Sequence, residues 1–319
     1  MQLPVTRNSL TIEARPSEAS PSALDGAASS VDEAPEEVRY KTHRRFDRAA
    51  RLFSEPGLHQ LFAARVLVVG VGGVGSFAAE SLARSGVGTI GLIDFDKVCV
   101  TNTNRQLHAM QGTIGRSKVE VMAERLRLVH PTARIETTAE FYNRDTSDRI
   151  LEGRVDFVID AIDNLSAKAH LLATCLERKI PVVSSMGAAA RLDPTAVRVA
   201  DLSETYKDRF ASALRKILRT EYGLEFGDGK QLGIPAVFSP EPVTLPSPPS
   251  YDEGVGFRCV CPGGKNGMHD CDRRARIDGT ASFVTGTFGL VAASVVVRSL
   301  IAEEFERAQR SNAGPTELD

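Results

Sequence analysis

The sequence predicts an α/β fold: a doubly wound, mainly parallel, Rossmann-like sheet with a C-terminal extension. Three observations indicate this class. Short apolar runs such as 155–159 lack a polar face, as expected for parallel strands covered on both sides. Segments with helical periodicity separate these runs. The first run enters a glycine-rich turn that opens a helix, which is typical of a nucleotide-binding βαβ unit.

The expected elements follow one another without an internal repeat, after a helical lead-in at 44–61. Strands are expected at 65–69, 89–93, 134–138, 157–161 and 182–185, with helices at 74–85, 116–129 and 165–177. Beyond Pro194 the alternation changes. The last segments are a strand at 197–201, a basic amphipathic helix at 208–222, a Gly- and Pro-rich extended excursion at 227–257 and an apolar helix at 283–301.

The chain divides into five expected parts. Residues 1–40 are rich in Ser, Ala, Pro and Glu without hydrophobic periodicity, which predicts a disordered tail. The other parts are a nucleotide-binding core at 41–200, a basic helix with a Gly-, Pro- and Cys-containing substrate region at 201–279, a packing helix at 280–305 and a flexible tail at 306–319. Thr285, Ser294 and several glycines favour a buried or dimer-facing helix over a membrane span.

Composition excludes several classes of protein. The 319 residues are 42% hydrophobic and 25% charged, which is ordinary for a globular chain, and a net charge of −2 gives no overall basic field for nucleic acid. Any RNA binding therefore requires a local basic patch. Five cysteines do not resemble a secreted disulfide framework, and the N-terminal segment lacks the features of a signal or transit peptide. A cytoplasmic, reducing location is expected.

The most specific pattern is the glycine turn. Gly70 and Gly72 permit a tight turn and a close backbone approach, and Gly75 lets the following helix pack closely. The first amides of that helix are unpaired and favour an anionic oxygen. Asp94 ends the next strand, where an acid can accept hydrogen bonds from ribose hydroxyls. The plain alternative is a tight strand-to-helix turn without a ligand.

Polar residues that follow indicate more than a dinucleotide site. Asn102 and Arg105 come soon after the second strand and suggest a triphosphate held for attack. Arg105 and Lys118 could instead be ordinary surface charges. Asp160 could be a strand-end turn former, and His108 could contact a base or be a buried, hydrogen-bonded side chain.

These motifs resemble the ubiquitin-activating-enzyme-like superfamily, which includes the thiamine and molybdopterin sulfur-carrier adenylyltransferases. The segments that carry the resemblance are Gly-Val-Gly-Gly-Val-Gly at 70–75, Asp-Phe-Asp at 94–96, Asn-Thr-Asn-Arg-Gln at 102–106, Lys118 and Asp-Ala-Ile-Asp-Asn at 160–164. Within the superfamily, other segments are similar to the tRNA threonylcarbamoyladenosine dehydratases. They lie at 99–109, 121–125, 193–195 and 283–292, and the likeness covers about residues 44–305.

The resemblance implies an adenylation reaction. A carboxylate is a poor electrophile, and attack on the α-phosphate of ATP would convert it to an acyl adenylate with AMP as leaving group. The implied carboxylate belongs to N6-threonylcarbamoyladenosine next to the anticodon of tRNA. The ureido group of the base would then close on the activated carbonyl, so that water is lost overall without an enzyme nucleophile. ATP and Mg²⁺ are the implied cofactors.

The resemblance also assigns the site. The implied catalytic residues are Arg48, Asn102, Arg105, Lys118 and Asp163, of which Asp163 would lie beside Mg²⁺ or the α-phosphate. The implied nucleotide-binding residues are Gly70, Gly72, Gly73, Gly75, Asp94, Asp96 and Asn164. Arg48 matches an arginine that reaches the ATP phosphates of the partner protomer, which implies a homodimer. A sulfur-relay protein is a further possible partner.

Three other functions stay open. The adenylated group could be the C-terminal glycine of a ubiquitin-like sulfur carrier, although the paired C-x-x-C motifs of those relatives are absent. A nicotinamide-dependent oxidoreductase would leave Asn102, Arg105 and Lys118 without a task. A nucleotide-sensing scaffold would not need this set of polar residues.

Two further features have alternatives of their own. Cys259, Cys261, His269 and Cys271 could bind zinc or remain reduced thiols in a loop, whereas Cys99 and Cys175 are expected to pack as small buried side chains. The basic helix is expected either to contact the tRNA backbone or to be a solvated face. Its cations are Arg209, Arg215, Lys216 and Arg219, with Arg273, Arg274 and Arg276 further along.

Overall fold

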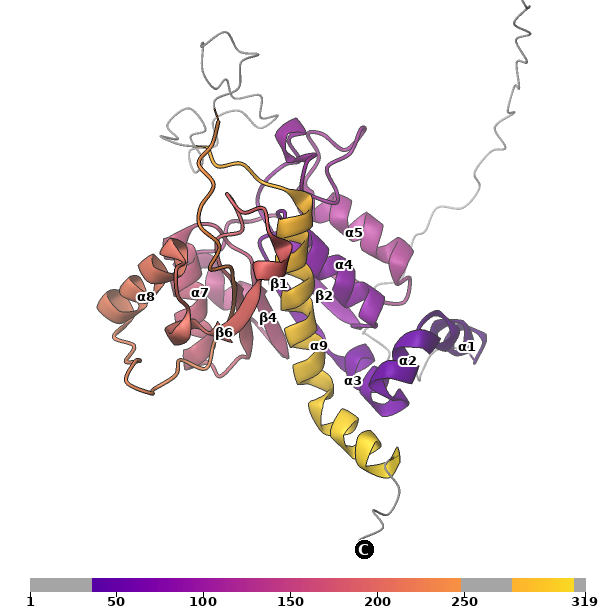
Figure 1. Cartoon of the computed structure of the whole chain (residues 1–319). Helices are drawn as coiled ribbons and strands as arrows, with labels where there is room; N and C mark the ends of the chain where they lie inside the picture. The colour runs from indigo at the N-terminus through magenta and orange to yellow at the C-terminus, as the bar shows by residue number, and fades with distance from the viewer. Residues whose placement is uncertain (1–35, 248–276, 313–319) are drawn as a thin grey trace, which may run out of the picture.

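The computed structural model describes residues 36–247 and 277–312 and confirms the predicted fold class. Seven strands form one sheet in the order β3-β2-β1-β4-β5-β7-β6, and only the β6–β7 pair is antiparallel. The strands are β1 (Arg65–Val69), β2 (Thr89–Ile93), β3 (Arg134–Thr138), β4 (Phe157–Asp160), β5 (Val182–Ser185), β6 (Arg198–Asp201) and β7 (Pro235–Phe238). Figure 1 shows the sheet between two layers of helices.

Strand alternation divides the core into two faces. Val66 and Val68 point into one cluster with residues of α3, α4, α5 and α9, whereas Leu67 and Val69 point into the other with residues of α6, α7 and α8. The helices are α1 (Glu36–Arg45), α2 (Asp47–Phe53), α3 (Glu55–Ala63), α4 (Gly75–Ser85), α5 (Lys118–Val129), α6 (Arg144–Ile150), α7 (Leu165–Glu177), α8 (Arg209–Tyr222) and α9 (Ser282–Asn312). The central strands are therefore apolar on both sides, as predicted.

The long apolar helix α9 packs inside the domain. Val284, Phe288 and Ala292 are fully buried, and Gly289 lies so close to α4 that an added Cβ would be 2.3 Å from the Val74 carbonyl oxygen. Although α9 is long and apolar enough to cross a membrane, its contacts with α3, α4 and the sheet are those of a core helix. The expectation of a packing helix agrees with this arrangement.

Several elements differ from the expectation. Helix α1 begins at Glu36, inside the expected disordered tail at 1–40, and α9 continues to Asn312, inside the expected flexible tail at 306–319. Residues 235–238 form β7 between β5 and β6, so reading 227–257 as an extended excursion was wrong for these four residues. Pro235 begins the strand, where the missing N–H is tolerated, and a run of three buried residues is too short to stand out among prolines and glycines. Helix α6 was not predicted because its polar sequence has no apolar period; Asn143 caps it instead.

Candidate active site

The glycine turn joins the carboxyl end of β1 to α4. Gly70 has a φ of +92°, and a Cβ there would be 2.6 Å from the Ala161 carbonyl oxygen. A Cβ on Gly75 would be 1.8 Å from the carbonyl oxygen of Gly70. Packing within the chain therefore requires glycine at these two positions. At Gly72 the nearest atom would be 3.8 Å away, so its backbone has room beside it for a ligand.

Asp94 ties the glycine turn to the end of β2. Its carboxylate accepts hydrogen bonds from the Val71 amide at 2.7 Å and the Asp96 amide at 2.9 Å. Burial raises the pKa of Asp94, and the Lys118 ammonium works against that shift. Each carboxylate oxygen has a second lone pair, so these bonds leave acceptor capacity for a ribose hydroxyl.

Lys118 begins α5 and is only 6% exposed. Its Nζ donates to Asp96 Oδ2 at 2.8 Å. Burial alone would lower the pKa of Lys118, but nearby carboxylates outweigh it and raise the pKa. These carboxylates belong to Asp94, Asp96 and Asp163. A solvated surface cation is therefore excluded, and a charged ammonium lies among three acids.

The loop after β2 places two more predicted residues beside the turn. Asn102 ends a short 3₁₀ helix, η2 (Val100–Asn102), and its Oδ1 accepts the Cys99 amide hydrogen at 3.1 Å. Arg105 donates to the Thr101 carbonyl oxygen at 3.0 Å. The stem of Arg105 lies against the turn, since a Cβ on Gly73 would be 3.2 Å from its Cγ. The buried Asn102 thus organises the loop that carries the guanidinium.

A buried ion pair that the sequence analysis missed joins the last residue of β4 to α7. Lys168 and Asp160 are fully buried, and Lys168 Nζ donates to Asp160 Oδ2 at 2.6 Å. The ammonium also donates to Ser184 Oγ at 3.3 Å and the Ser185 carbonyl oxygen at 2.9 Å. Burial lowers the pKa of Lys168, opposed by Asp160. A lysine on the inward face of a predicted core helix was the available signal.

This ion pair holds the loop that presents Asp163. The other oxygen of Asp160 accepts the Ile162 amide hydrogen at 3.1 Å, so Asp160 is a structural residue rather than a ligand contact. Asp163 is exposed beyond it, and Asn164 caps α7 by accepting the Ala167 amide hydrogen at 3.0 Å. The carboxylate of Asp163 is therefore exposed to solvent on a loop that the buried Lys168–Asp160 pair holds in place.

Arg48 lies apart from the other predicted site residues. It is an exposed residue of α2, which packs on α3 near the end of the molecule where β1 begins (Figure 1). The glycine turn follows the opposite end of β1. Within one protomer, Arg48 thus lies toward the opposite end of the strands from Gly72 and Gly73, where the phosphates are expected.

His108 and two cysteines are buried packing residues. Neither ring nitrogen of His108 has a hydrogen-bond partner within the described residues, and burial, followed by the Lys118 charge, lowers the pKa of His108 to about 3. The expectation of a buried histidine is confirmed, without the expected hydrogen bond. Burial raises the pKa of the Cys175 thiol to about 12, which makes it unreactive, and Cys99 is also buried. The loop with Cys259, Cys261, His269 and Cys271 lies outside the described residues.

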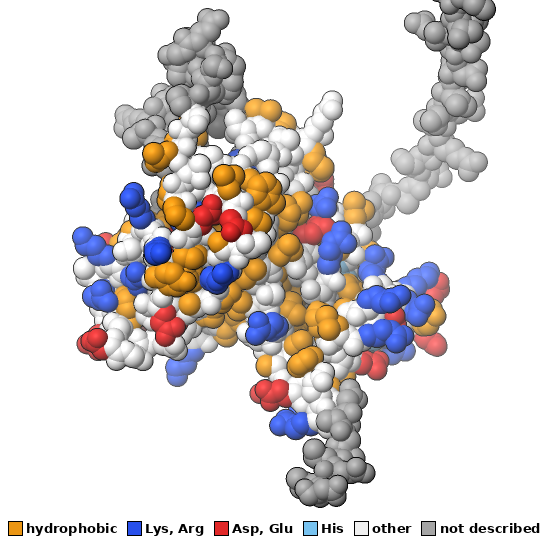
Figure 2. Space-filling view, viewed as in Figure 1, with side chains coloured by type: hydrophobic (Ala, Val, Ile, Leu, Met, Phe, Trp, Pro, Cys, Tyr) orange, Lys and Arg blue, Asp and Glu red, His pale blue; other side chains and the backbone are white. Residues whose placement is uncertain are grey.

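The surface carries an apolar patch and a basic helix. Hydrophobic side chains gather near the middle of one face beside α9, and cations gather over α8 (Figure 2). Exposed apolar side chains include Leu192, Val199 of β6, and Phe283 and Leu290 of α9, which are 45–60% exposed. On α8 the guanidinium of Arg215 is engaged with the carbonyls of Leu202 and Thr205, whereas Arg209, Lys216 and Arg219 are exposed.

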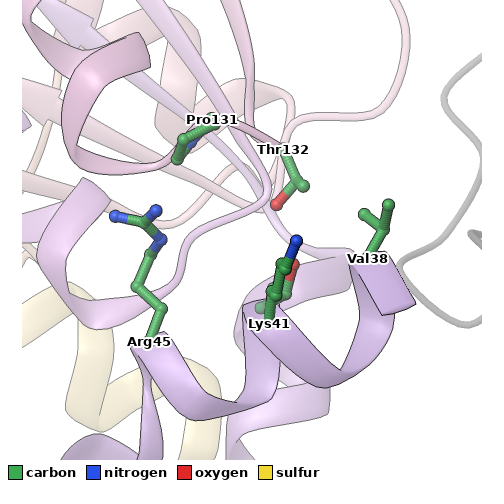
Figure 3. A pocket seen from close by; sticks show the side chains of 6 residues that line it. Val38, Lys41, Arg45, Pro131 and Thr132 are labelled. Carbon is green, nitrogen blue, oxygen red and sulfur yellow. The ribbon is translucent and has the colours of Figure 1, made fainter. Parts of the chain in front are cut away.

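A small hollow lies away from this site. It has a volume of about 190 Å³ and separates α1 from the turn between α5 and β3. Figure 3 shows Lys41 and Arg45 of α1 directed toward Pro131 and Thr132 across it. None of the predicted nucleotide-binding residues lines it.

Comparison with known proteins agrees with this geometry. The ThiF family model matches residues 46–316. The tRNA threonylcarbamoyladenosine dehydratase of Escherichia coli (strain K12) is 42% identical over 82% of this chain and 94% of that protein, and its Haemophilus influenzae counterpart is 39% identical over 82% and 95%. The E. coli dehydratase in complex with ATP superposes with a TM-score of 0.71 at 39% identity, covering 82% of this chain and 96% of that one. The chain therefore belongs to the ThiF family and, within it, to the tRNA threonylcarbamoyladenosine dehydratases.

Proposed function

We propose that this protein is an ATP-dependent tRNA threonylcarbamoyladenosine dehydratase. It activates the carboxylate of N6-threonylcarbamoyladenosine next to the anticodon and closes the ring with release of AMP. The observation that carries the proposal is the buried, charged Lys118 among three carboxylates beside an open glycine turn. A relative that has the same fold and is 39% identical has been solved in complex with ATP.

The chemistry takes place in two steps. A carboxylate oxygen of the substrate attacks the α-phosphorus, the bond to the bridging oxygen breaks, and pyrophosphate leaves. An atom of the ureido group then attacks the acyl carbon, loses its proton and displaces AMP. Summed over both steps, ATP is converted to AMP and pyrophosphate while the base loses the elements of water.

The residues contribute placed charge rather than a nucleophile. The open backbone at Gly72, the neighbouring Gly73 and the first amides of α4 receive the phosphates. Arg105 contacts the triphosphate, and the ammonium of Lys118 offsets charge that develops on pyrophosphate. Asn102 supports the same loop and Asp94 holds the ribose, with Asp96 orienting Lys118.

Asp163 is the proposed Mg²⁺ ligand. Magnesium prefers carboxylate oxygens and retains several waters, and Asp163 is an exposed carboxylate within electrostatic reach of Lys118. The ion would screen the triphosphate charge. Asn164 fixes the start of α7 directly beside this ligand.

The active unit proposed is a homodimer in which Arg48 completes the partner's site. This assignment is supported by the position of Arg48 at the far end of β1 and by the exposed apolar side chains beside α9. The tRNA is proposed to contact the exposed cations of α8. The proposed cytoplasmic location rests on the cysteine content and the N-terminal segment, and the proposed sulfur-relay partner rests on the family resemblance.

The test is ATP–pyrophosphate exchange. We expect exchange with tRNA carrying threonylcarbamoyladenosine and none with the same tRNA lacking the modification. A small protein ending in Gly-Gly is the competing substrate. Exchange that requires the Gly-Gly protein and does not occur with the modified tRNA would replace the proposal with sulfur-carrier adenylation.

A further inference from the structure

Two histidines and a glutamate meet in the N-terminal helices, away from the nucleotide site. His43 lies in the last turn of α1, and Glu55 and His59 lie one turn apart on α3. One ligand atom from each side chain falls within 4.8 Å of the others. The two imidazole rings are 5.4 Å apart between centroids. The proposed function uses none of these three residues.

The donor set matches a particular class of ion. Imidazole nitrogen and carboxylate oxygen together suit zinc and its neighbours among the first-row transition metals, whereas Mg²⁺ and Ca²⁺ prefer oxygen alone. Tetrahedral ligands at about 2.1 Å lie roughly 3.4 Å from one another, so the side chains must close by up to about 1.4 Å. Both histidines are half-buried and Glu55 is exposed, which leaves room for this movement and for a water as fourth ligand.

Neighbouring aromatic rings hold the two imidazoles in place. Phe62 contacts His43 edge-on at 5.9 Å and His59 at 6.0 Å between ring centroids. Phe62 itself packs against Phe46 and His130 in the interior. The rings are thus oriented by the domain rather than free in solvent, which lowers the entropy lost when an ion binds.

We propose that His43, Glu55 and His59 form a binding site for a divalent transition metal of the zinc class. The ion closes residues 43–59 into a loop around α2 and links α1 to α3. Because α2 carries Arg48, the ion steadies the segment that presents this arginine. That last consequence rests on the proposed function, whereas the binding site does not.

The test uses the full-length chain with any affinity tag removed and its metals stripped by a chelator. Titration calorimetry with ZnCl₂ should show about one equivalent bound, and His43→Gln and His59→Gln should each weaken that binding at least about tenfold. Glu55→Gln should weaken it as well. His170→Gln, a half-exposed histidine on α7, is the matched control and should bind as the parent does.

Co²⁺ distinguishes this site from the cysteine loop. A site of imidazole and carboxylate gives tetrahedral cobalt bands in the visible without thiolate-to-cobalt charge transfer in the near ultraviolet, and it should survive Cys259→Ser with Cys261→Ser. Thiolate charge transfer that the serine changes abolish, or zinc binding unaltered by His43→Gln and His59→Gln, would overturn the proposal. The parent spectrum decides the matter even where a variant fails to fold.

Discussion

Within residues 36–247 and 277–312 two lysines are buried, and a comparison of the two distinguishes a ligand-binding charge from a structural one. Lys168, in α7 beside β4, donates three hydrogen bonds, to Asp160, Ser184 and Ser185, and burial lowers its pKa. Lys118, on the β2–α5 side, has one hydrogen bond within the described residues, to Asp96, and its pKa is raised. Because all the hydrogen-bond donors of Lys168 are used within the fold, this lysine has a structural role. Lys118 has donors that are not used by the described residues and lies near the open glycine turn, so it can bind a phosphate.

The largest effect expected is on stability, at the satisfied lysine. Lys168→Met leaves Asp160 charged and unpaired in the interior, which should cost about 3–5 kcal/mol of unfolding free energy. Urea unfolding followed by circular dichroism measures the loss. A loss below about 1 kcal/mol would show that Asp160 and Lys168 are not the coupled pair described.

Substitution of Lys118 should affect the rate of the reaction more than the stability of the fold. Lys118→Met should lower kcat by about 10²–10³-fold, similar to the loss of a placed charge donor at other transition states. Steady-state AMP release measures it, and the far-ultraviolet spectrum should match the parent. If kcat stays within about threefold of the parent value, Lys118 does not act on the leaving pyrophosphate.

Buried histidines should make stability depend on pH. The folded-state pKa values of His108 and His130 are about 3 and about 4, below the ordinary 6.5, because burial opposes their charged forms. The unfolded chain therefore binds more protons below pH 6.5, so the unfolding free energy falls as pH falls. Each histidine contributes up to about 1.4 kcal/mol per pH unit.

The measurement is unfolding free energy between pH 7 and pH 5. His130→Phe keeps an aromatic ring against Phe46 and should flatten the slope, because it removes one of the histidines whose pKa burial lowers. An unchanged slope would mean that His130 is already charged in the folded protein.

The smallest expected signal concerns the arginine that lies apart from both lysines. Arg48→Ala chains mixed with Asp163→Ala chains should recover about a quarter of the parent activity, since random mixing gives half heterodimers with one intact site each. Each variant alone serves as its own control. Failure to recover any activity would place Arg48 and Asp163 in the same protomer's site, whereas full activity of Arg48→Ala chains alone would place Arg48 outside it.

The first half of the sheet could be predicted strand by strand because each strand is a plain apolar run next to a clear turn. The second half was harder. β7 is short and begins at Pro235, and its position between β5 and β6 depends on pairing between distant segments. In the site, Lys118 and Asp163 could be named because their motifs resemble those of a known family. Lys168 could not, because its role depends on Asp160 and Ser184, which meet it only in the folded sheet.

The most direct test of the whole account is a single-turnover reaction with stoichiometric tRNA carrying threonylcarbamoyladenosine. We predict that one AMP appears for each modified nucleoside whose mass falls by one water, and that the ratio stays at one throughout. ADP as the nucleotide product, or AMP formed without loss of water from the base, would contradict the account.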